Sequence, residues 1–348
     1  MTTVHLHKWV GVPGLALAAA LLAPTAARAQ QTQVTVSGVG YAQYGYLLKD
    51  TANHNNAFDV TRAYINLIGK FAGGVGVRVT ADVNRPAGDN SLRYRLKYAY
   101  ATYQAAGSPL TFKLGLIHTP WIDWEEALWD YRMQGPVALD RNGYLTSADF
   151  GAGIDGKWGP DKVNMQVTFV NGEGYSGGTG DQRKDIEARV SVRLLDTNDS
   201  SRVGGLRISG YAGYGKPTGG GKRQRYVGML SYRTKQVTLA GEYAITKDSA
   251  GAGALLDGQV ASGFGVFKFP NSKAAVIGRV DFVKPNKNGV STTPGFSNTR
   301  FIAGLSYQVS PNLRALADVD YLSYKNGSPT PAAEAARASG LFQIQFTF

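Results

Sequence analysis

Hydrophobic and polar residues alternate with a period of two along most of the chain after residue 30. Between Val75 and Val83 every second residue is apolar, and Arg78 and Asp82 are among the residues that separate them. Successive side chains of an extended strand point to opposite faces, so this pattern predicts strands with one apolar and one polar face. A helical period of 3.6 residues fits neither this segment nor residues 185–194.

The same alternation recurs to the end of the chain and predicts about 16 strands. We expect them near residues 33–48, 58–71, 75–84, 92–104, 110–118, 148–158, 162–171, 185–195, 204–214, 223–234, 236–247, 259–269, 273–283, 298–308, 312–322 and 339–348. A membrane-spanning strand needs roughly 9–11 residues, and these segments meet that length. The pattern is weakest in the Gly- and Ala-rich stretch 249–269.

Short and long connections alternate between the expected strands. Residues 72–74 and 309–311 form tight turns, whereas 171–184, 284–297 and 323–337 are long and polar. This asymmetry is typical of outer-membrane barrels. The polar face also carries charge in strand after strand. The sequence therefore predicts an all-β fold, a transmembrane antiparallel up-and-down β-barrel. A soluble barrel with its apolar face inward would show the same alternation and remains an alternative.

The first 29 residues have the pattern of a cleaved signal peptide. A basic Lys8 precedes an apolar run from Trp9 to Ala23. Ala27-Arg28-Ala29 then gives the small-x-small motif that precedes a signal-peptide cleavage site. The run is too short to cross a bilayer as a helix, which takes roughly 20 residues. Residues 1–29 are thus expected to be removed, leaving residues 30–348 as a single barrel domain.

One connection, residues 119–146, is much longer than the others. A structureless loop of this length is uncommon inside a compact fold unless it has a function. It is rich in aromatic residues, which predicts packing against the rest of the fold. We expect it to be an inward-folded third loop that narrows the barrel, with its charges at the constriction: Asp123, Glu125, Glu126, Asp130 and Arg132. A short amphipathic surface helix over 122–133 is the alternative.

Several segments resemble one known family. They are FDVTRAYINLIGKF (58–71), LGLIHTPW (114–121), DFGAGIDGKWG (149–159), FVNGEGY (169–175) and GRVDFVKPN (278–286). Together they resemble the phosphate-selective porin O and P family, and the closing QIQFTF, ending on Phe348, is like the assembly signal of outer-membrane proteins. The resemblance implies a trimer of 16-stranded barrels with a basic lumen and an inward-folded third loop.

Charge gives the polar face a possible role. The chain has 37 Lys and Arg against 25 Asp and Glu. If the apolar face touches lipid, the basic residues of the second to fifth strands line the pore: Arg62, Lys70, Arg78, Arg93, Arg95, Lys97 and Lys113. Arg93, Arg95 and Lys97 form a ladder at every second residue. Arginine and lysine bind oxyanions and pass them between weak sites, which predicts anion preference. The acidic residues of 119–146 repel anions and so oppose this preference. We therefore expect the anion preference to be modest and leave phosphate specificity open.

Other chemistry finds little support. The chain has no cysteine, and only His54 and His118 follow the signal peptide, so neither a zinc site nor a cofactor is expected. Gly172 to Gly177 match G-x-G-x-x-G without a following helix, which indicates a loop. His118 falls on the apolar parity of its strand, where a lipid-facing hydrolase would carry its base. Tyr94, Tyr98 and Tyr100 fall opposite the arginines, which argues against nucleic-acid binding.

These patterns favour a non-enzymatic porin in the bacterial outer membrane. It would let small hydrophilic solutes and inorganic anions diffuse through a water-filled barrel embedded in outer-membrane lipid, and the family resemblance implies that the barrel forms a homotrimer. The alternatives are a closed barrel that acts as an adhesin or surface anchor and a hydrolase that uses His118. In the final strand, Phe342, Phe346 and Phe348 share one face, which predicts that Phe348 closes the barrel on the lipid side against the strand near Val34.

Overall fold

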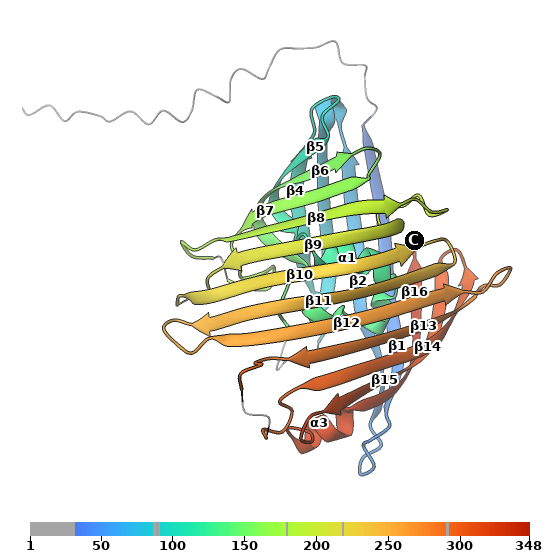
Figure 1. Cartoon of the computed structure of the whole chain (residues 1–348). Coiled ribbons are helices and arrows are strands. Elements are labelled where there is room, and N and C mark those ends of the chain that lie inside the picture. Colours follow the sequence, from blue (N-terminus) through green and yellow to red (C-terminus); the bar gives the residue numbers. More distant parts are fainter. Residues whose placement is uncertain (1–31, 86–88, 90, 179, 218, 290–291) are drawn as a thin grey trace, which may run out of the picture.

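The computed structural model describes residues 32–348 apart from 86–88, 90, 179, 218 and 290–291, and these form a closed barrel of 16 strands (Figure 1). The signal peptide expected at 1–29 lies outside the described residues. The strands are β1 (Gln33–Leu47), β2 (Asn56–Lys70), β3 (Val75–Asn84), β4 (Arg93–Tyr103), β5 (Leu110–His118), β6 (Ala148–Trp158), β7 (Val163–Val170), β8 (Asp185–Leu195), β9 (Gly205–Gly215), β10 (Gly221–Arg233), β11 (Val237–Ala250), β12 (Leu256–Lys268), β13 (Ala274–Lys284), β14 (Asn298–Ser310), β15 (Leu313–Tyr324) and β16 (Ala338–Thr347).

Each strand pairs antiparallel with its neighbours in sequence, and β1 pairs with β16 to close the barrel. The predicted up-and-down barrel of 16 strands is therefore confirmed. Its bounds differ most around the Gly- and Ala-rich stretch, where β11 runs on to Ala250 and β12 begins earlier, at Leu256.

The closing seam depends on glycine. The backbone N–H groups of Gly38 and Phe348 each donate to the carbonyl of the other residue, at 2.9 and 3.1 Å. The Phe348 ring lies over Gly38, where a Cβ atom would come within 2.1 Å of it, and the Phe346 ring lies over Gly40 in the same way. Phe348 is 65% exposed, as expected for an outward stripe.

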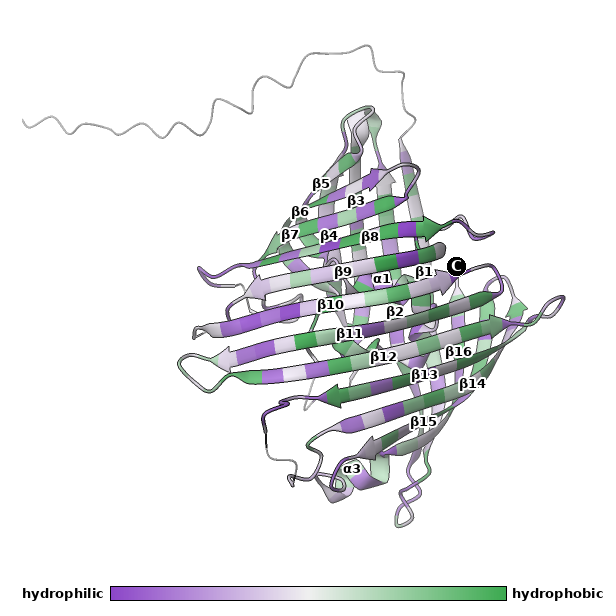
Figure 2. Ribbon diagram, viewed as in Figure 1, coloured by the Kyte–Doolittle hydropathy of each residue, from purple (hydrophilic) through white to green (hydrophobic). Residues whose placement is uncertain are grey.

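The outer face of the barrel is apolar and the inner face is polar. Figure 2 shows hydrophobic and hydrophilic residues alternating along the strands. Leu114 and Leu305 are largely exposed, whereas Asp82, Ser191 and Arg207 are fully buried. A soluble barrel would bury the apolar side chains and expose the polar and charged ones. The exposed apolar belt is that of a membrane barrel. None of the described helices is both long enough and apolar enough to span a membrane.

Two irregular positions change which side chains face inward. The β3–β4 register shifts so that Lys97 has no partner, and Tyr98 and Tyr100 turn to the inner face. The Arg78 guanidinium lies 4.5 Å from the Tyr98 ring centre, so the expectation that these two tyrosines lie opposite the arginines is wrong.

In β5, Gly115 has a φ of 132°, a left-handed conformation that favours glycine, and a Cβ atom there would come within 2.3 Å of the Ala99 carbonyl oxygen of β4. Beyond it His118 faces inward, where its Nε2 lies 2.9 Å from Lys113 Nζ. Strict alternation places His118 on the lipid side, and that expectation is wrong. The hydrolase hypothesis needed a lipid-facing base, so it loses its basis.

Short helical turns interrupt the connections. η1 (Ala72–Gly74) lies between β2 and β3, and α3 (Pro331–Ala336) precedes β16, with the Thr330 hydroxyl accepting from the Ala333 N–H at 3.1 Å. The connection between β5 and β6 contains α1 (Ile122–Trp129), η2 (Arg132–Gln134) and α2 (Ala138–Arg141). Ile122, Trp124, Leu128 and Trp129 of α1 are almost fully buried, so α1 is not the surface helix considered as an alternative.

Candidate functional site

Residues 119–146 are fixed to the polar face of the wall by aromatic side chains. Trp124 is 1% exposed, and its ring lies 4.0, 5.7 and 5.4 Å from the guanidinium carbons of Arg189, Arg202 and Arg207. Cation–π contacts of this kind strengthen when water is excluded. The aromatic density noted in the sequence thus serves packing.

Hydrogen bonds from distant strands add to this attachment. Trp121 Nε1 donates to Glu242 Oε2 of β11 at 3.1 Å. Tyr131 Oη lies 2.6 Å from Ser306 Oγ of β14, and Gln343 Nε2 of β16 donates to the Met133 carbonyl at 2.9 Å. The segment is therefore tied to strands on one side of the barrel.

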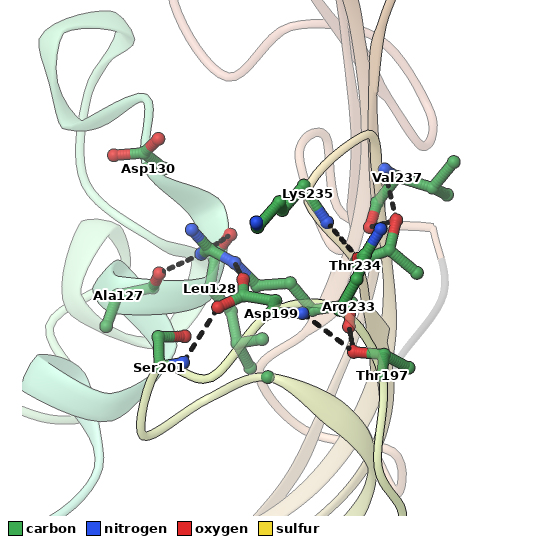
Figure 3. A network of polar contacts seen from close by, with 12 residues as sticks. Ala127, Leu128, Asp130, Thr197, Asp199, Ser201, Arg233, Thr234, Lys235 and Val237 are labelled. Carbon is green, nitrogen blue, oxygen red and sulfur yellow. Dashed lines mark hydrogen bonds and ion pairs between the residues drawn. The ribbon is translucent and has the colours of Figure 1, made fainter.

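The C-terminal end of α1 is capped by arginines from the wall, and Figure 3 shows one of them, Arg233. Arg233 donates through Nη1 to the Ala127 carbonyl at 2.5 Å and through Nε to Asp199 Oδ2 at 2.7 Å. Arg314 Nη1 donates to the Asp130 carbonyl at 2.8 Å. The last carbonyls of a helix have no partner within it, so these donors satisfy them and complement the negative end of the helix dipole.

The opposite side of α1 is left open. A cavity separates it from β1–β4, and we call it the α1 gap. Its charged and aromatic lining consists of Tyr41, Tyr64, Arg78, Lys97 and Tyr98 from the wall, Asp123, Glu126, Asp130 and Arg132 from the α1 segment, and Arg202 from the β8–β9 turn.

Two cations of the α1 gap have no acidic partner among the described residues. Lys97 Nζ lies 3.3 Å from Tyr64 Oη and 4.7 Å from the centre of that ring. Arg78 donates to Asn66 Oδ1 at 3.2 Å and to Thr80 Oγ1 at 3.1 Å. Within the described part of the chain, no carboxylate oxygen lies within ion-pair distance of either cation. Both are thus free to attract a mobile anion.

The acids of the α1 gap, in contrast, are paired. Asp123 lies 2.7 Å from Arg202, Glu126 lies 2.6 Å from Arg132, and Asp130 lies 3.5 Å from Arg314. The acidic field expected from residues 119–146 is therefore largely neutralised by arginines.

Two of these acids differ in their titration. Burial opposes the charge of Asp123, but Arg202, His118 and Arg78 together outweigh it and hold the pKa of Asp123 well below its usual range. Burial raises the pKa of Glu126 despite the nearby Arg132. Asp123 therefore keeps its charge at acidic pH, whereas Glu126 loses its charge more readily than an ordinary glutamate.

A second polar cavity adjoins the α1 gap and shares Arg78, Asp123 and Arg202 with it. Its remaining lining is His118, Asp155, Lys157, Asn164, Gln166 and Arg189. Arg189 donates to the Pro120 carbonyl at 2.9 Å and to Asn164 Oδ1 at 2.6 Å, without an acidic partner among the described residues. A polar route with unpaired cations thus continues past α1.

The other predicted pore-lining residues lie elsewhere on the wall. Lys113 is buried against Asp155 at 2.7 Å, and Lys70 is exposed at the short-turn end of β2. Arg62 Nη1 lies 3.5 Å from the Val83 carbonyl, outside both cavities.

The ladder expected from β4 is not a row of free cations. Arg93 pairs with Asp89. Arg95 pairs with Asp82 at 3.1 Å and donates to Tyr175 Oη at 2.8 Å, which ties the 171–184 connection to the wall. Only Lys97 of the three faces the α1 gap.

Glu125 differs from its neighbours in the α1 segment. It is fully buried outside the α1 gap, and neither carboxylate oxygen has a hydrogen-bond partner among the described residues. Burial, together with the nearby Glu242, raises the pKa of Glu125 well above its usual range. The carboxyl of Glu125 is therefore harder to ionise than that of an ordinary glutamate, and it lies outside the α1 gap.

Sequence reasoning missed several residues of the α1 gap. Tyr64 and Tyr41 lie at inward positions of β2 and β1, a position that alternation alone could have indicated. Arg202 lies in the β8–β9 turn, 79 residues from the Asp123 it pairs with. No sequence signal relates these two.

No protein-family model matches the sequence, and no curated protein is similar to it in sequence. The resemblance to the porin O and P family therefore stays a prediction. Solved structures match the fold. The chain is similar to an anion-selective porin from Comamonas acidovorans, with a TM-score of 0.65 and 12% identity over 91% of this chain and 100% of that one.

Two further structures show the same likeness. Salmonella typhi OmpF, in a complex with daunomycin, has a TM-score of 0.67 and 13% identity over 90% of this chain and 97% of that one. A loop L8 deletion mutant of OmpT, an outer membrane protein of Vibrio cholerae, has a TM-score of 0.65 and 11% identity over 91% and 99%. At such low identity these likenesses establish the fold of a porin barrel.

Proposed function

We propose that this protein is a porin of the bacterial outer membrane. It forms a water-filled channel through which small hydrophilic solutes diffuse passively. Residues 119–146 fold inside the barrel and act as the constriction loop, and the α1 gap is the narrow part of the path. Buried aromatic and arginine contacts fasten the loop to β8–β16. The open path for solutes therefore runs between the loop and β1–β4.

The channel prefers anions modestly. The observation that supports this preference is the pair Lys97 and Arg78, which have no acidic partner among the residues that the structure describes, while Asp123, Glu126 and Asp130 are all paired. The lining of the α1 gap holds four cationic and three acidic side chains. Such a mixture favours small inorganic anions as a class over one specific anion such as phosphate.

The biological unit proposed here is a homotrimer that matures by loss of residues 1–29. Chemical crosslinking of the purified protein and N-terminal sequencing of the mature chain test these two points separately.

Single-channel recording in planar bilayers tests the pore itself. Purified protein should insert in discrete conductance steps that grow with KCl concentration. A barrel that serves only as an adhesin or anchor would give no steps, and that result would refute the proposed function.

A further inference from the structure

The outer face of β8–β11 carries an apolar groove within the membrane belt. Its floor is a pair of directly opposed glycines, Gly210 of β9 and Gly228 of β10. A Cβ atom at Gly228 would have nothing within 4 Å, so the surface is hollow there. Val190 and Tyr243 lie on either side of this pair in the strand register.

Tyrosines border the groove toward the end of the barrel that carries the long connections. Tyr226 Oη donates to Tyr214 Oη at 2.9 Å, and their rings meet edge to face at 5.6 Å. Tyr243 is 50% exposed and donates to Gln259 Oε1 at 2.7 Å. Such rings mark the level at which the apolar belt of a membrane barrel meets the polar interface.

Lysines lie directly beyond these tyrosines. Lys247 shares the outer face of β11 and is two residues from Ile245 of the groove, and Lys222 and Lys216 are exposed at the ends of β10 and β9. None of the three is within ion-pair distance of a carboxylate among the described residues. The neighbouring Asp257 pairs with Lys287 at 2.9 Å, which leaves the cluster basic.

We propose that this surface binds a phosphate-bearing lipid. One acyl chain lies in the groove over Gly210 and Gly228, and the lipid phosphate contacts Lys216, Lys222 and Lys247. The occupant follows from the order of the surface: an apolar hollow inside the belt, tyrosines at its rim, and unpaired cations where anionic head groups are found. This site lies on the outer wall, so it is independent of conduction through the α1 gap.

Native mass spectrometry of the detergent-purified full chain tests the site. We expect phosphatidylglycerol to be retained at least fivefold more than phosphatidylcholine. Changing Lys216, Lys222 and Lys247 together to Gln should abolish that preference. The matched control changes Lys235, Lys268 and Lys273 to Gln at the short-turn end and should leave it intact.

The groove is tested by filling it. Gly228→Leu should reduce retention of both lipids severalfold, whereas Gly241→Leu, on the same face outside the groove and with nothing within 4 Å, should not. A triple Lys variant that keeps the wild-type preference for phosphatidylglycerol overturns the proposal, and so do control variants that lose as much lipid as the variants they match. The proposal is also overturned if inorganic phosphate displaces the lipid and Gly228→Leu has no effect on lipid retention. In that case the lysines bind free phosphate and the groove binds no acyl chain. Unchanged single-channel conductance shows that each variant is folded, and separates this outcome from a failure of the porin function.

Discussion

Lys97 Nζ lies 3.3 Å from Tyr64 Oη, on the wall that faces α1 across the gap, and this ammonium is buried without an acidic partner among the described residues. Lys97→Gln should therefore lower the ratio of chloride to potassium permeability. In a water-filled pore the removal of one nearby charge is worth ~1 kcal/mol, so the expected decrease is about two- to fivefold. Reversal potentials in a KCl gradient measure it. Lys70→Gln, at the exposed end of β2, is the matched control and should change little; equal effects would remove Lys97 from the selectivity mechanism.

Trp124 fastens residues 119–146 to the barrel wall through three arginines, and it is 1% exposed. Trp124→Ala should loosen the loop, since a buried aromatic-to-alanine change costs ~3–5 kcal/mol. We expect larger and noisier single-channel currents together with a lower melting temperature. Trp158→Ala, on the outer face at 39% exposure, should leave the current level unchanged. A quiet channel of normal conductance in the Trp124 variant would mean that the loop does not narrow the path.

Glu125 should make stability depend on pH. The pKa of this buried carboxyl is raised by burial and by Glu242, whereas the unfolded chain releases the proton near the ordinary value of 4.5. Folding then holds a proton that the unfolded chain has lost, so stability should fall as pH rises from about 4.5 toward the folded-state pKa. Glu125→Gln cannot ionise and should melt higher at pH 8, with a flatter melting temperature between pH 5 and 8. A variant that follows the wild-type curve would contradict the buried neutral state.

Gly38 is required by the ring of the terminal residue. Gly38→Val should clash with Phe348 and destabilise the closing seam by about 1–3 kcal/mol, as overpacked sites do. The measurement is the temperature at which the folded barrel unfolds in detergent. Phe348→Ala should restore stability in the Gly38→Val background, and Gly241→Val, which has open space at its Cβ, should be tolerated. A double variant less stable than either single one would exclude this contact as the cause.

Alternation along the sequence predicted the barrel well because a closed barrel repeats one rule, apolar outward and polar inward, in every strand. It predicted β3 and β8 to the residue, and it placed Phe348 on the outer seam. It failed where a strand departs from regular geometry. The unpaired Lys97 and the left-handed Gly115 each turn the following side chains to the other face, which is why Tyr98 and His118 were misplaced.

The α1 gap could be predicted only in part. The length and aromatic content of residues 119–146 indicated a loop with a function, and its charged residues were visible. Which charges stay free depends on contacts between distant segments, such as Asp123 with Arg202 and Asp130 with Arg314. Those contacts cross the barrel and leave no periodic trace, so an acidic loop appeared more negative in the sequence than it is in the fold.

The reversal potential of the unmodified protein tests the central claim most directly. With the protein in a planar bilayer between unequal KCl solutions, the zero-current voltage should have the sign that indicates chloride preference. It should correspond to a ratio of chloride to potassium permeability modestly above one. A zero-current voltage of the opposite sign, which indicates potassium preference, would contradict the account. The paired acids of α1 would then outweigh Lys97 and Arg78.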